Sequence, residues 1–229
     1  MSGITHWCVL EDAGAVAAAA CTYLSRCAAR AIAVRGRFRL VLAGGRTPEA
    51  AYRLLAASDQ RWSAWEIWFG DERCLPPDHP ERNSVMAARA WLDLVPIPRA
   101  QIHPIRAELG AGPAARDYAP GVRAAAPFDL VVLGLGEDGH TASLFPGRRP
   151  DPRAWVVPVH GAPKPPPDRV SLGPRALGAA HRILVLATGA TKREAVLAWR
   201  QGRALPIALV TGGRPTLALL DRAADGVSG

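Results

Sequence analysis

The stretch FDLVVLGLGEDGHTASLFPG, residues 128–147, runs from an apolar segment into a glycine-rich loop that carries two carboxylates and a histidine. Residues 128–133 are apolar, rich in β-branched side chains and followed by glycine, which predicts a strand buried on both faces of a parallel sheet. The loop would then lie at the carboxyl end of that strand. Ligands bind at this end in open α/β sheets, so we expect the loop to belong to a functional site.

Residues 134–139 also match G-x-G-x-x-G, the dinucleotide-binding fingerprint. That fingerprint holds a pyrophosphate on bare amides at a helix N-terminus, and Glu137 and Asp138 would place two negative charges beside it. Pro146 and Gly147 would end the following helix after about one turn. No acidic residue ends the next strand-like run, WVVPV, to hold a ribose. We therefore interpret the match as accidental.

Proton transfer is a better use of this loop. A tight turn at Gly139 would let the Asp138 carboxylate orient the His140 imidazole and raise its basicity, which makes His140 a candidate general base. In the alternative, His140 only caps a short helix that begins at Thr141, and Asp138 is a solvated turn residue. The position after a buried strand favours the first interpretation. Ser143 would lie inside that helix and lacks the G-x-S-x-G elbow, so we do not expect it to be a nucleophile.

Length and composition predict one α/β domain spanning residues 1–229, since the 229 residues are 49% hydrophobic. The start of the chain lacks a basic segment before an apolar core, and Glu11 and Asp12 interrupt it, so we expect no secretory signal. No run reaches membrane-spanning length. The cysteines show no C-x-x-C spacing, which argues against zinc and a disulfide framework and favours a reducing cytoplasm. They are Cys8, Cys21, Cys27 and Cys74.

The net charge of +8 indicates an anionic partner, and nucleic acid is the usual first candidate. The arginines, however, are scattered, with no basic run longer than two and no interleaved aromatic residues. We therefore expect no nucleic-acid partner. Among the 28 lysines and arginines, only Lys164 and Lys192 are lysines.

Strand-like and helix-like segments alternate along most of the chain. At least six strand-like runs separated by helices predict an α/β fold with a doubly wound, mostly parallel, Rossmann-like sheet. We expect a first helix over 11–34, a broken helix over 107–126 and a closing helix over 215–224. The expected strands are 38–43, 65–69, 102–105, 128–133, 155–159, 183–187 and, as the last one, 206–210.

The segment GGRTPEAAYRLLA, residues 44–56, predicts an anion-binding turn before a helix. Thr47 is expected as the N-cap and Pro48 as the first helical residue, while Gly44 and Gly45 let the backbone turn tightly. Such a turn presents free amides and a hydroxyl to an anion. An ordinary strand-to-helix turn is the alternative.

A second charged loop follows the strand expected at 65–69. Asp71, Glu72 and Arg73 come directly after it, and Asn83 or Ser84 can cap the next helix. A solvated turn would have the same composition. Prolines stiffen the loop, so we take Arg73 as a candidate substrate clamp and Asp71 as a candidate hydroxyl binder or second acid/base group.

Two more cations stand at positions of restricted geometry. Arg169 follows the proline-rich connection GAPKPPPD and is expected to hold a fixed direction, although such a segment can also be a surface linker. Residues 189–191 form another loop that can aim amides at an anion. Lys192 opens the next helix, where a lysine opposes the helix macrodipole, so its presence indicates a function.

LGLGEDGHTASLFPG resembles the signature of the 6-phosphogluconolactonase family. That family belongs to a deaminase/ribose-5-phosphate isomerase/CoA-transferase-like fold group that includes the glucosamine-6-phosphate deaminases. GGRTP resembles the phosphate loop of these enzymes, and PKPPPDRVS is similar to the lactonase motif P-K-P-P-P-x-R-[IV]-T, with Ser171 in place of threonine. GDER and the later asparagine also resemble the family, but Arg82 stands where the family has serine, so that role does not transfer.

The resemblance implies hydrolysis of 6-phospho-D-glucono-1,5-lactone to 6-phospho-D-gluconate, with no cofactor and no metal. It implies that His140 is the base, that Asp138 orients it, and that Asp71 occupies the position of an acid/base aspartate in the deaminases. Substrate or phosphate binding is implied for Gly44, Gly45, Arg46, Thr47, Arg73, Asn83, Gly139, Arg169 and Lys192. The expected partner is a phosphorylated sugar lactone, without nucleic acid or membrane, bound by a monomer or weak homodimer.

Two other functions stay open on the sequence. The first is a glucosamine-6-phosphate deaminase or related sugar-phosphate isomerase of the same fold. Such deaminases have a glutamate shortly after the D-G-H histidine, and residues 141–147 contain no acid, which favours the lactonase. The second is a basic nucleic-acid-binding module, supported only by the net charge.

Overall fold

The computed structural model describes residues 5–226 and contains two sheets. The strands of the larger sheet are β1 (Thr5–Leu10), β2 (Phe38–Leu42), β3 (Trp65–Phe69), β5 (Ile102–His103), β6 (Leu130–Gly134), β9 (Ile183–Ala187) and β10 (Thr216–Asp221). They form a seven-stranded sheet in the order β1-β10-β9-β6-β2-β3-β5, and every neighbouring pair is parallel. A small antiparallel sheet joins β4 (Asp71–Arg73), β8 (Arg169–Leu172) and β7 (Val156–Val159).

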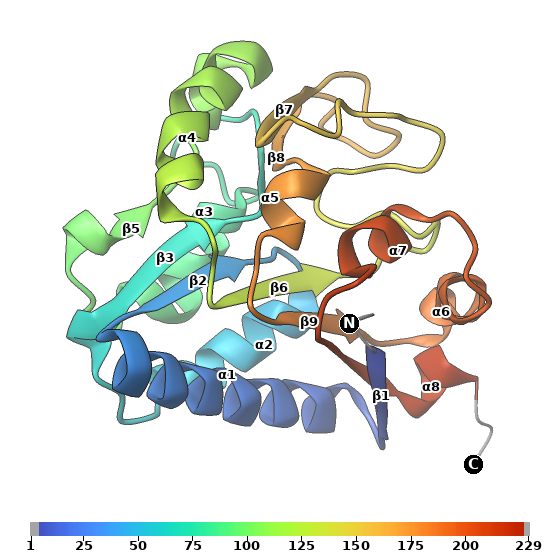
Figure 1. Ribbon diagram of the computed structural model, residues 1–229, viewed down its shortest axis with the longest axis horizontal. Coiled ribbons are helices and arrows are strands. Elements are labelled where there is room, and N and C mark those ends of the chain that lie inside the picture. The colour runs from blue at the N-terminus through green and yellow to red at the C-terminus, as the bar shows by residue number, and fades with distance from the viewer. Residues whose placement is uncertain (1–4, 227–229) are drawn as a thin grey trace.

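Helices cover both faces of the large sheet (Figure 1). They are α1 (Ala13–Arg35), α2 (Arg46–Ala56), α3 (Asn83–Ala87), α4 (Ala111–Ala125), α5 (Pro174–Gly178), α6 (Arg193–Arg200), α7 (Pro206–Thr211) and α8 (Arg222–Asp225). In the view of Figure 1, α1 and α2 lie below the sheet, and α4, α5 and α7 lie above it. The prediction of a doubly wound, mostly parallel α/β fold is confirmed.

Local sequence explains the longest helix. The Asp12 side chain accepts a hydrogen bond from the Ala15 amide (2.8 Å) at the start of α1, and Gly36 ends it with a φ of 72°. Its buried face consists mostly of alanine at helical spacing, together with Val16 and Leu24. Small side chains let the helix lie close against the sheet, and this burial stabilises a helix that is otherwise weakly amphipathic.

The chain order of the strands reverses between β2 and β6. After β2 the chain continues outward to β3, whereas after β6 it continues in the opposite direction to β9. In open α/β sheets such a reversal opens a crevice beyond the carboxyl ends of the two strands. The loops that follow β2 and β6, which contain Gly44 and His140, therefore meet at this crevice.

The order of the last two elements was predicted wrongly. Residues 206–211 form α7, which begins at Pro206, and residues 216–221 form β10. The strand β10 lies between β1 and β9 and is largely buried, so it shows an unbroken apolar run rather than alternation. Periodicity cannot separate a short buried helix from a short buried strand, and here it assigned each to the wrong segment.

Other boundaries also differ from expectation. No helix begins at Thr141, because Thr141 and Leu144 instead exchange backbone hydrogen bonds in a tight turn. The α4 helix is continuous and includes Pro120, although we expected a broken helix over 107–126. The strands β1, β4 and β8 were not predicted, and the last two come from segments that we expected to be loops. Within residues 5–226, no helix is both long and apolar enough to cross a membrane.

Candidate active site

A cavity of about 320 Å³ lies at the crevice between β2 and β6. Its walls come from the loop after β2, from β4 and α3, from the loop after β6, and from the proline-rich segment that leads into β8. These segments lie far apart in the sequence. Of the predicted site residues, the cavity brings together Gly44, Gly45, Asp71, Arg73, Asn83, His140, Arg169 and Lys192.

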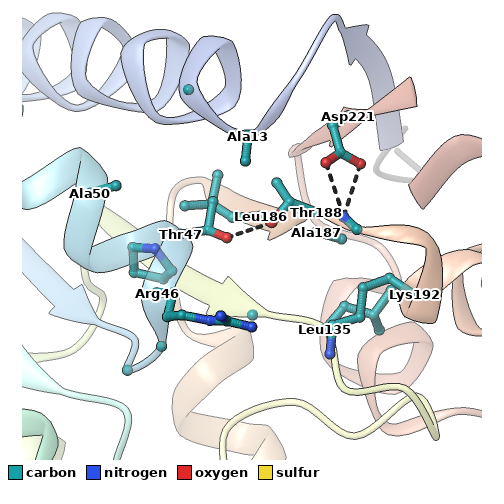
Figure 2. A pocket seen from close by; sticks show the side chains of 16 residues that line it. Ala13, Arg46, Thr47, Ala50, Leu135, Leu186, Ala187, Thr188, Lys192 and Asp221 are labelled. Atoms are coloured by element: carbon teal, nitrogen blue, oxygen red, sulfur yellow. Dashed lines mark hydrogen bonds between the residues drawn. The ribbon is translucent and has the colours of Figure 1, made fainter. Parts of the chain in front are cut away.

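A second cavity of about 570 Å³ adjoins the first, and the two share Gly44, Gly45 and Lys192. Arg46 and Thr47 line only this second cavity. Figure 2 shows the Arg46 and Lys192 side chains extending into it from opposite sides. His140 lies only in the smaller cavity, so we place the chemistry there.

Asp138 and His140 form the closest polar pair in the loop after β6. The Asp138 carboxylate lies 2.5 Å from His140 Nδ1 and accepts a hydrogen bond from the His140 amide (3.1 Å). Burial raises the pKa of Asp138, but the hydrogen bonds from His140 outweigh it and hold that pKa below its ordinary value. The carboxylate is therefore ionised and engages Nδ1, which leaves Nε2 as the nitrogen that can accept a proton. Asp138 itself and Gly139 line neither cavity.

Two glycines make this loop geometry possible. Gly139 has a φ of 86°, which side-chain-bearing residues rarely adopt, and it lets Asp138 fold back onto His140. A Cβ atom at Gly136 would lie 2.0 Å from His140 Nδ1, so the ring packs directly against this backbone. The Thr141 hydroxyl closes the loop by donating to the Gly134 carbonyl oxygen (2.9 Å).

Asp71 is buried at the edge of the cavity, and both of its carboxylate oxygens accept hydrogen bonds. The donors are the Asn83 amide group (3.0 Å) and the Ser143 hydroxyl (2.6 Å). Ser143 is itself buried and lies outside both cavities. The tight fit continues at Gly44, where a Cβ atom would lie 1.9 Å from Asn83 Oδ1.

The helix that carries Asn83 is capped by a residue that the sequence did not indicate. The Glu72 carboxylate is fully buried and accepts from the backbone amides of Asn83 and Ser84, both at 2.8 Å. The prediction that Asn83 or Ser84 caps this helix is therefore wrong. Arg82, which stands where the family has serine, is also buried and anchors the loop by donating to Glu108 (2.9 Å) and to the Ile105 carbonyl (2.6 Å).

Two arginines face the cavity from neighbouring strands. Arg73 on β4 and Arg169 on β8 are direct cross-strand partners. Arg169 donates to the carbonyls of Pro166 (3.1 Å) and Lys164 (2.9 Å), which fixes its direction. Burial and the nearby Arg73 lower the pKa of Arg169, with Asp71 acting in the opposite direction. Like charges directly opposite each other destabilise a sheet, so this pair favours an anion between them.

The Arg73 guanidinium group is hydrogen-bonded through one of its nitrogen atoms, Nη1. It donates to Asn83 Oδ1 (3.2 Å) and to the Glu81 carbonyl. Its Nε atom is buried and has no hydrogen-bond partner within the described part of the chain. Such a donor costs free energy unless a ligand supplies an acceptor.

Both lysines of the chain line the smaller cavity. Lys192 was predicted there, whereas Lys164 was not assigned to the site; the rarity of lysine and the position of Lys164 in the motif PKPPPDRVS were the signals that could have found it. Burial lowers the pKa of Lys192 and outweighs the opposing effect of Glu137. Lys192 ends a short 3-10 helix (Ala190–Lys192) and directly precedes α6.

The first turn of α2 differs in detail from the prediction. Gly45, with a φ of 105°, occupies the N-cap position instead of Thr47, because Arg46 and Thr47 are already helical. The Thr47 hydroxyl lies 2.7 Å from the Thr188 hydroxyl and so links this turn to the loop after β9. Gly189 in that loop donates its amide to Asp221 (2.9 Å).

Among residues 5–226, no three His, Cys, Asp or Glu side chains converge as a metal site would require. All four cysteines are free thiols. Burial, with a contribution from Asp168, raises the pKa of Cys74 to about 11.

The chain was compared with known proteins. Residues 11–219 match the family described as glucosamine-6-phosphate isomerases/6-phosphogluconolactonase. The 6-phosphogluconolactonase of Streptomyces coelicolor is 39% identical, over 98% of this chain and 95% of the relative. Two crystal structures of 6-phosphogluconolactonases superpose with a TM-score of 0.88. That of Thermotoga maritima is 27% identical and covers 95% of this chain and 100% of its own. That of Trypanosoma brucei is 26% identical and covers 99% and 100%. The chain belongs to the glucosamine-6-phosphate isomerase/6-phosphogluconolactonase family.

Proposed function

We propose that this protein is a 6-phosphogluconolactonase, which hydrolyses 6-phospho-D-glucono-1,5-lactone to 6-phospho-D-gluconate in the oxidative pentose phosphate pathway. The observation that carries the proposal is one cavity holding both a carboxylate-paired histidine and a set of fixed cations, in a chain whose relatives bear this name. The absence of an acid in residues 141–147 supports a lactonase over a deaminase.

In the proposed chemistry, His140 acts as the general base. Nε2 removes a proton from a water molecule, whose oxygen attacks the lactone carbonyl carbon. The ester bond to the ring oxygen then breaks, and the imidazolium returns the proton to that oxygen. The ionised Asp138 stabilises the imidazolium formed between these two steps and holds the ring in the reactive tautomer.

Negative charge develops on the carbonyl oxygen during the attack, and donors must face it. Arg73 is suited to this role because its buried Nε lacks a partner and because Asn83 and Glu81 hold its other end. The backbone amides of the loops around the cavity are the alternative donors. Asp71 would bind a sugar hydroxyl or take part in proton transfer.

The phosphate is assigned to the cationic side of the site. Arg169 and Lys192 both line the smaller cavity, and Lys192 also reaches the cavity that contains the first turn of α2. The amides after Gly44 and Gly45 lie at a helix N-terminus, which favours anions. Arg46 and Thr47 are placed on the same side.

The direct test is hydrolysis of freshly prepared 6-phosphogluconolactone without added nucleotide or metal, corrected for the spontaneous rate. We expect the protein to catalyse ring opening. The release of acid in a weakly buffered solution measures this reaction. Glucosamine-6-phosphate should be assayed in parallel for ammonia release. Deamination without lactone hydrolysis would replace the proposal with the deaminase activity that the same family contains.

A further inference from the structure

One carboxylate stands between the two lysines of the site. Glu137 Oε2 lies 3.6 Å from Lys164 Nζ, and Glu137 Oε1 lies 3.9 Å from Lys192 Nζ. Both lysines line the smaller cavity, while Glu137 does not. Glu137 lies in the loop after β6, between Gly136 and Asp138. A negative charge is therefore positioned where the proposed function requires the substrate's own negative charge.

The contacts of Glu137 can be exchanged easily. Both distances exceed those of hydrogen bonds, and the Glu137 side chain is 51% exposed. The lysines hold the pKa of Glu137 below its ordinary value, so it is ionised at neutral pH. Exposed ion pairs of this kind are weak because water screens them. A competing anion of higher charge would displace the carboxylate.

The charges of the group are also unbalanced. One carboxylate faces two ammonium groups, whereas a phosphate monoester carries about −1.5 to −2 at pH 7. A phosphate can therefore neutralise the pair, and Glu137 cannot. A ligand with a single carboxylate would gain little over Glu137, which already occupies this place at a high effective concentration.

We propose that Glu137 is a specificity-determining residue: it occupies Lys164 and Lys192 in the free protein and yields them only to a doubly charged group such as phosphate. Specificity then comes partly from competition against singly charged ligands. The identity of the substrate in this inference rests on the proposed function, but the exchange of anions between the lysines does not.

Titration of inorganic phosphate, 6-phosphogluconate and gluconate into the intact protein at pH 8, followed by calorimetry, tests the exchange. Glu137→Gln should bind phosphate and 6-phosphogluconate about two- to tenfold more tightly, the range expected for two screened ion pairs. Gluconate, with one negative charge, should gain more, because it competes poorly with Glu137, so that the difference in affinity between the two classes of ligand narrows. Unchanged or weaker anion binding by Glu137→Gln would overturn the proposal.

Asp117→Asn is a matched control, because Asp117 forms a similar exposed ion pair with Arg106 (3.7 Å) away from both cavities. It should leave all three affinities unchanged. An equal gain in this control would mean that net charge alone is responsible and would contradict the inference. In a protein that already carries Lys164→Met, adding Glu137→Gln should raise phosphate affinity much less than it does in the native protein. A gain that persists would show that the lysine pair is not involved.

Turnover separates this inference from the proposed function. Glu137→Gln should change hydrolysis of plain gluconolactone less than hydrolysis of 6-phosphogluconolactone, because plain gluconolactone has no phosphate. An equal change with the uncharged lactone would place the effect of Glu137 at His140 and overturn the inference. Tighter phosphate binding in a protein that hydrolyses no lactone would support the exchange and refute only the proposed function.

Discussion

At the scale of single residues, environment decides what each titratable group can do. Asp138 is kept ionised by the histidine it orients, Lys192 is made less basic by burial, and Cys74 is made less acidic by burial. The three pKa shifts have different consequences. The first leaves a negative charge beside His140, the second makes Lys192 lose its charge at a lower pH than a free lysine, and the third lowers the fraction of Cys74 present as the reactive thiolate.

His140→Asn should lower kcat for the lactone about 10²- to 10⁴-fold, the range for loss of a general base. Asp138→Asn should cause a smaller loss, because it weakens the orientation of the imidazole and leaves the base in place. Steady-state kinetics on both folded variants provides the measurement, and binding of 6-phosphogluconate should survive in both. Near-normal turnover by His140→Asn would remove His140 from the mechanism.

The shift at Lys192 predicts how phosphate binding depends on pH. Its pKa in the folded protein lies below the ordinary 10.5, so the positive charge is lost at a lower pH than in a free lysine. Affinity for 6-phosphogluconate should therefore decline as the pH rises through a range below 10.5. Lys192→Arg keeps its charge there and should show a flatter profile. Calorimetry from pH 7 up to that alkaline range would give the affinity of each protein for 6-phosphogluconate. If the native protein and Lys192→Arg showed the same dependence on pH, the prediction would be wrong.

Cys74 should be a slow target for alkylation. A pKa of about 11, against an ordinary value of 9.0, reduces the thiolate fraction near neutral pH about 100-fold. Peptide mass spectrometry after timed iodoacetamide treatment would give the rate at Cys74, with a free cysteine derivative as the reference. Modification as fast as the reference would show that the thiol is not protected.

At the scale of elements, the site depends on close packing at two glycines. Gly44, in the loop after β2, packs against Asn83 of α3, and Gly136 packs against His140 within the loop after β6. The small sheet adds a second requirement, because the pairing of β4 with β8 sets Arg73 opposite Arg169. Strand pairing thus places two cations on one wall.

Gly136→Ala should displace the His140 ring, because its Cβ would overlap Nδ1. We expect a loss of about 1 to 3 kcal/mol in the free energy of unfolding, as for other overpacked sites, together with a large fall in kcat. Thermal melting of Gly136→Ala should be compared with that of Gly134→Ala. The second variant is the control, because a Cβ atom added at Gly134 would meet no atom within 4 Å. Equal melting temperatures for the two variants would show that the contact is not tight.

At the scale of the whole molecule, the crevice at the strand reversal collects charges from segments far apart in the chain. Arg73, Lys164, Arg169 and Lys192 all line one cavity with His140. Part of the protein's excess positive charge is thereby concentrated beside His140. This arrangement supports a small anionic substrate better than a long polyanion.

The cations should matter only for the phosphorylated substrate. Arg169→Ala or Lys192→Met removes a charge-assisted contact worth about 1.5 to 3 kcal/mol, which lowers kcat/KM for 6-phosphogluconolactone roughly 10- to 150-fold. Plain gluconolactone should be nearly unaffected, whereas His140→Asn should impair both substrates. Equal losses on both lactones in Lys192→Met would assign Lys192 to the fold or to the carbonyl end.

Local chemistry allowed the sequence alone to predict the fold class and the contact between Asp138 and His140. Apolar runs ending in glycine predicted β2, β3, β6 and β9, and a carboxylate two residues before a histidine predicted their pairing. These features depend on residues close together in the chain. The sequence could not separate α7 from β10, because a short buried apolar run fits either element.

Only the tertiary structure decided the contacts between distant segments. It placed Arg73 opposite Arg169, made Glu72 the cap of α3, gave Arg82 a buried anchoring role and set Glu137 between two lysines. Each depends on strand order and register, which arise from the packing of the whole sheet. In the sequence, Glu72 and Glu137 therefore look like ordinary charged loop residues. The positions of their partners are fixed by long-range packing in the folded chain and not by spacing along the sequence.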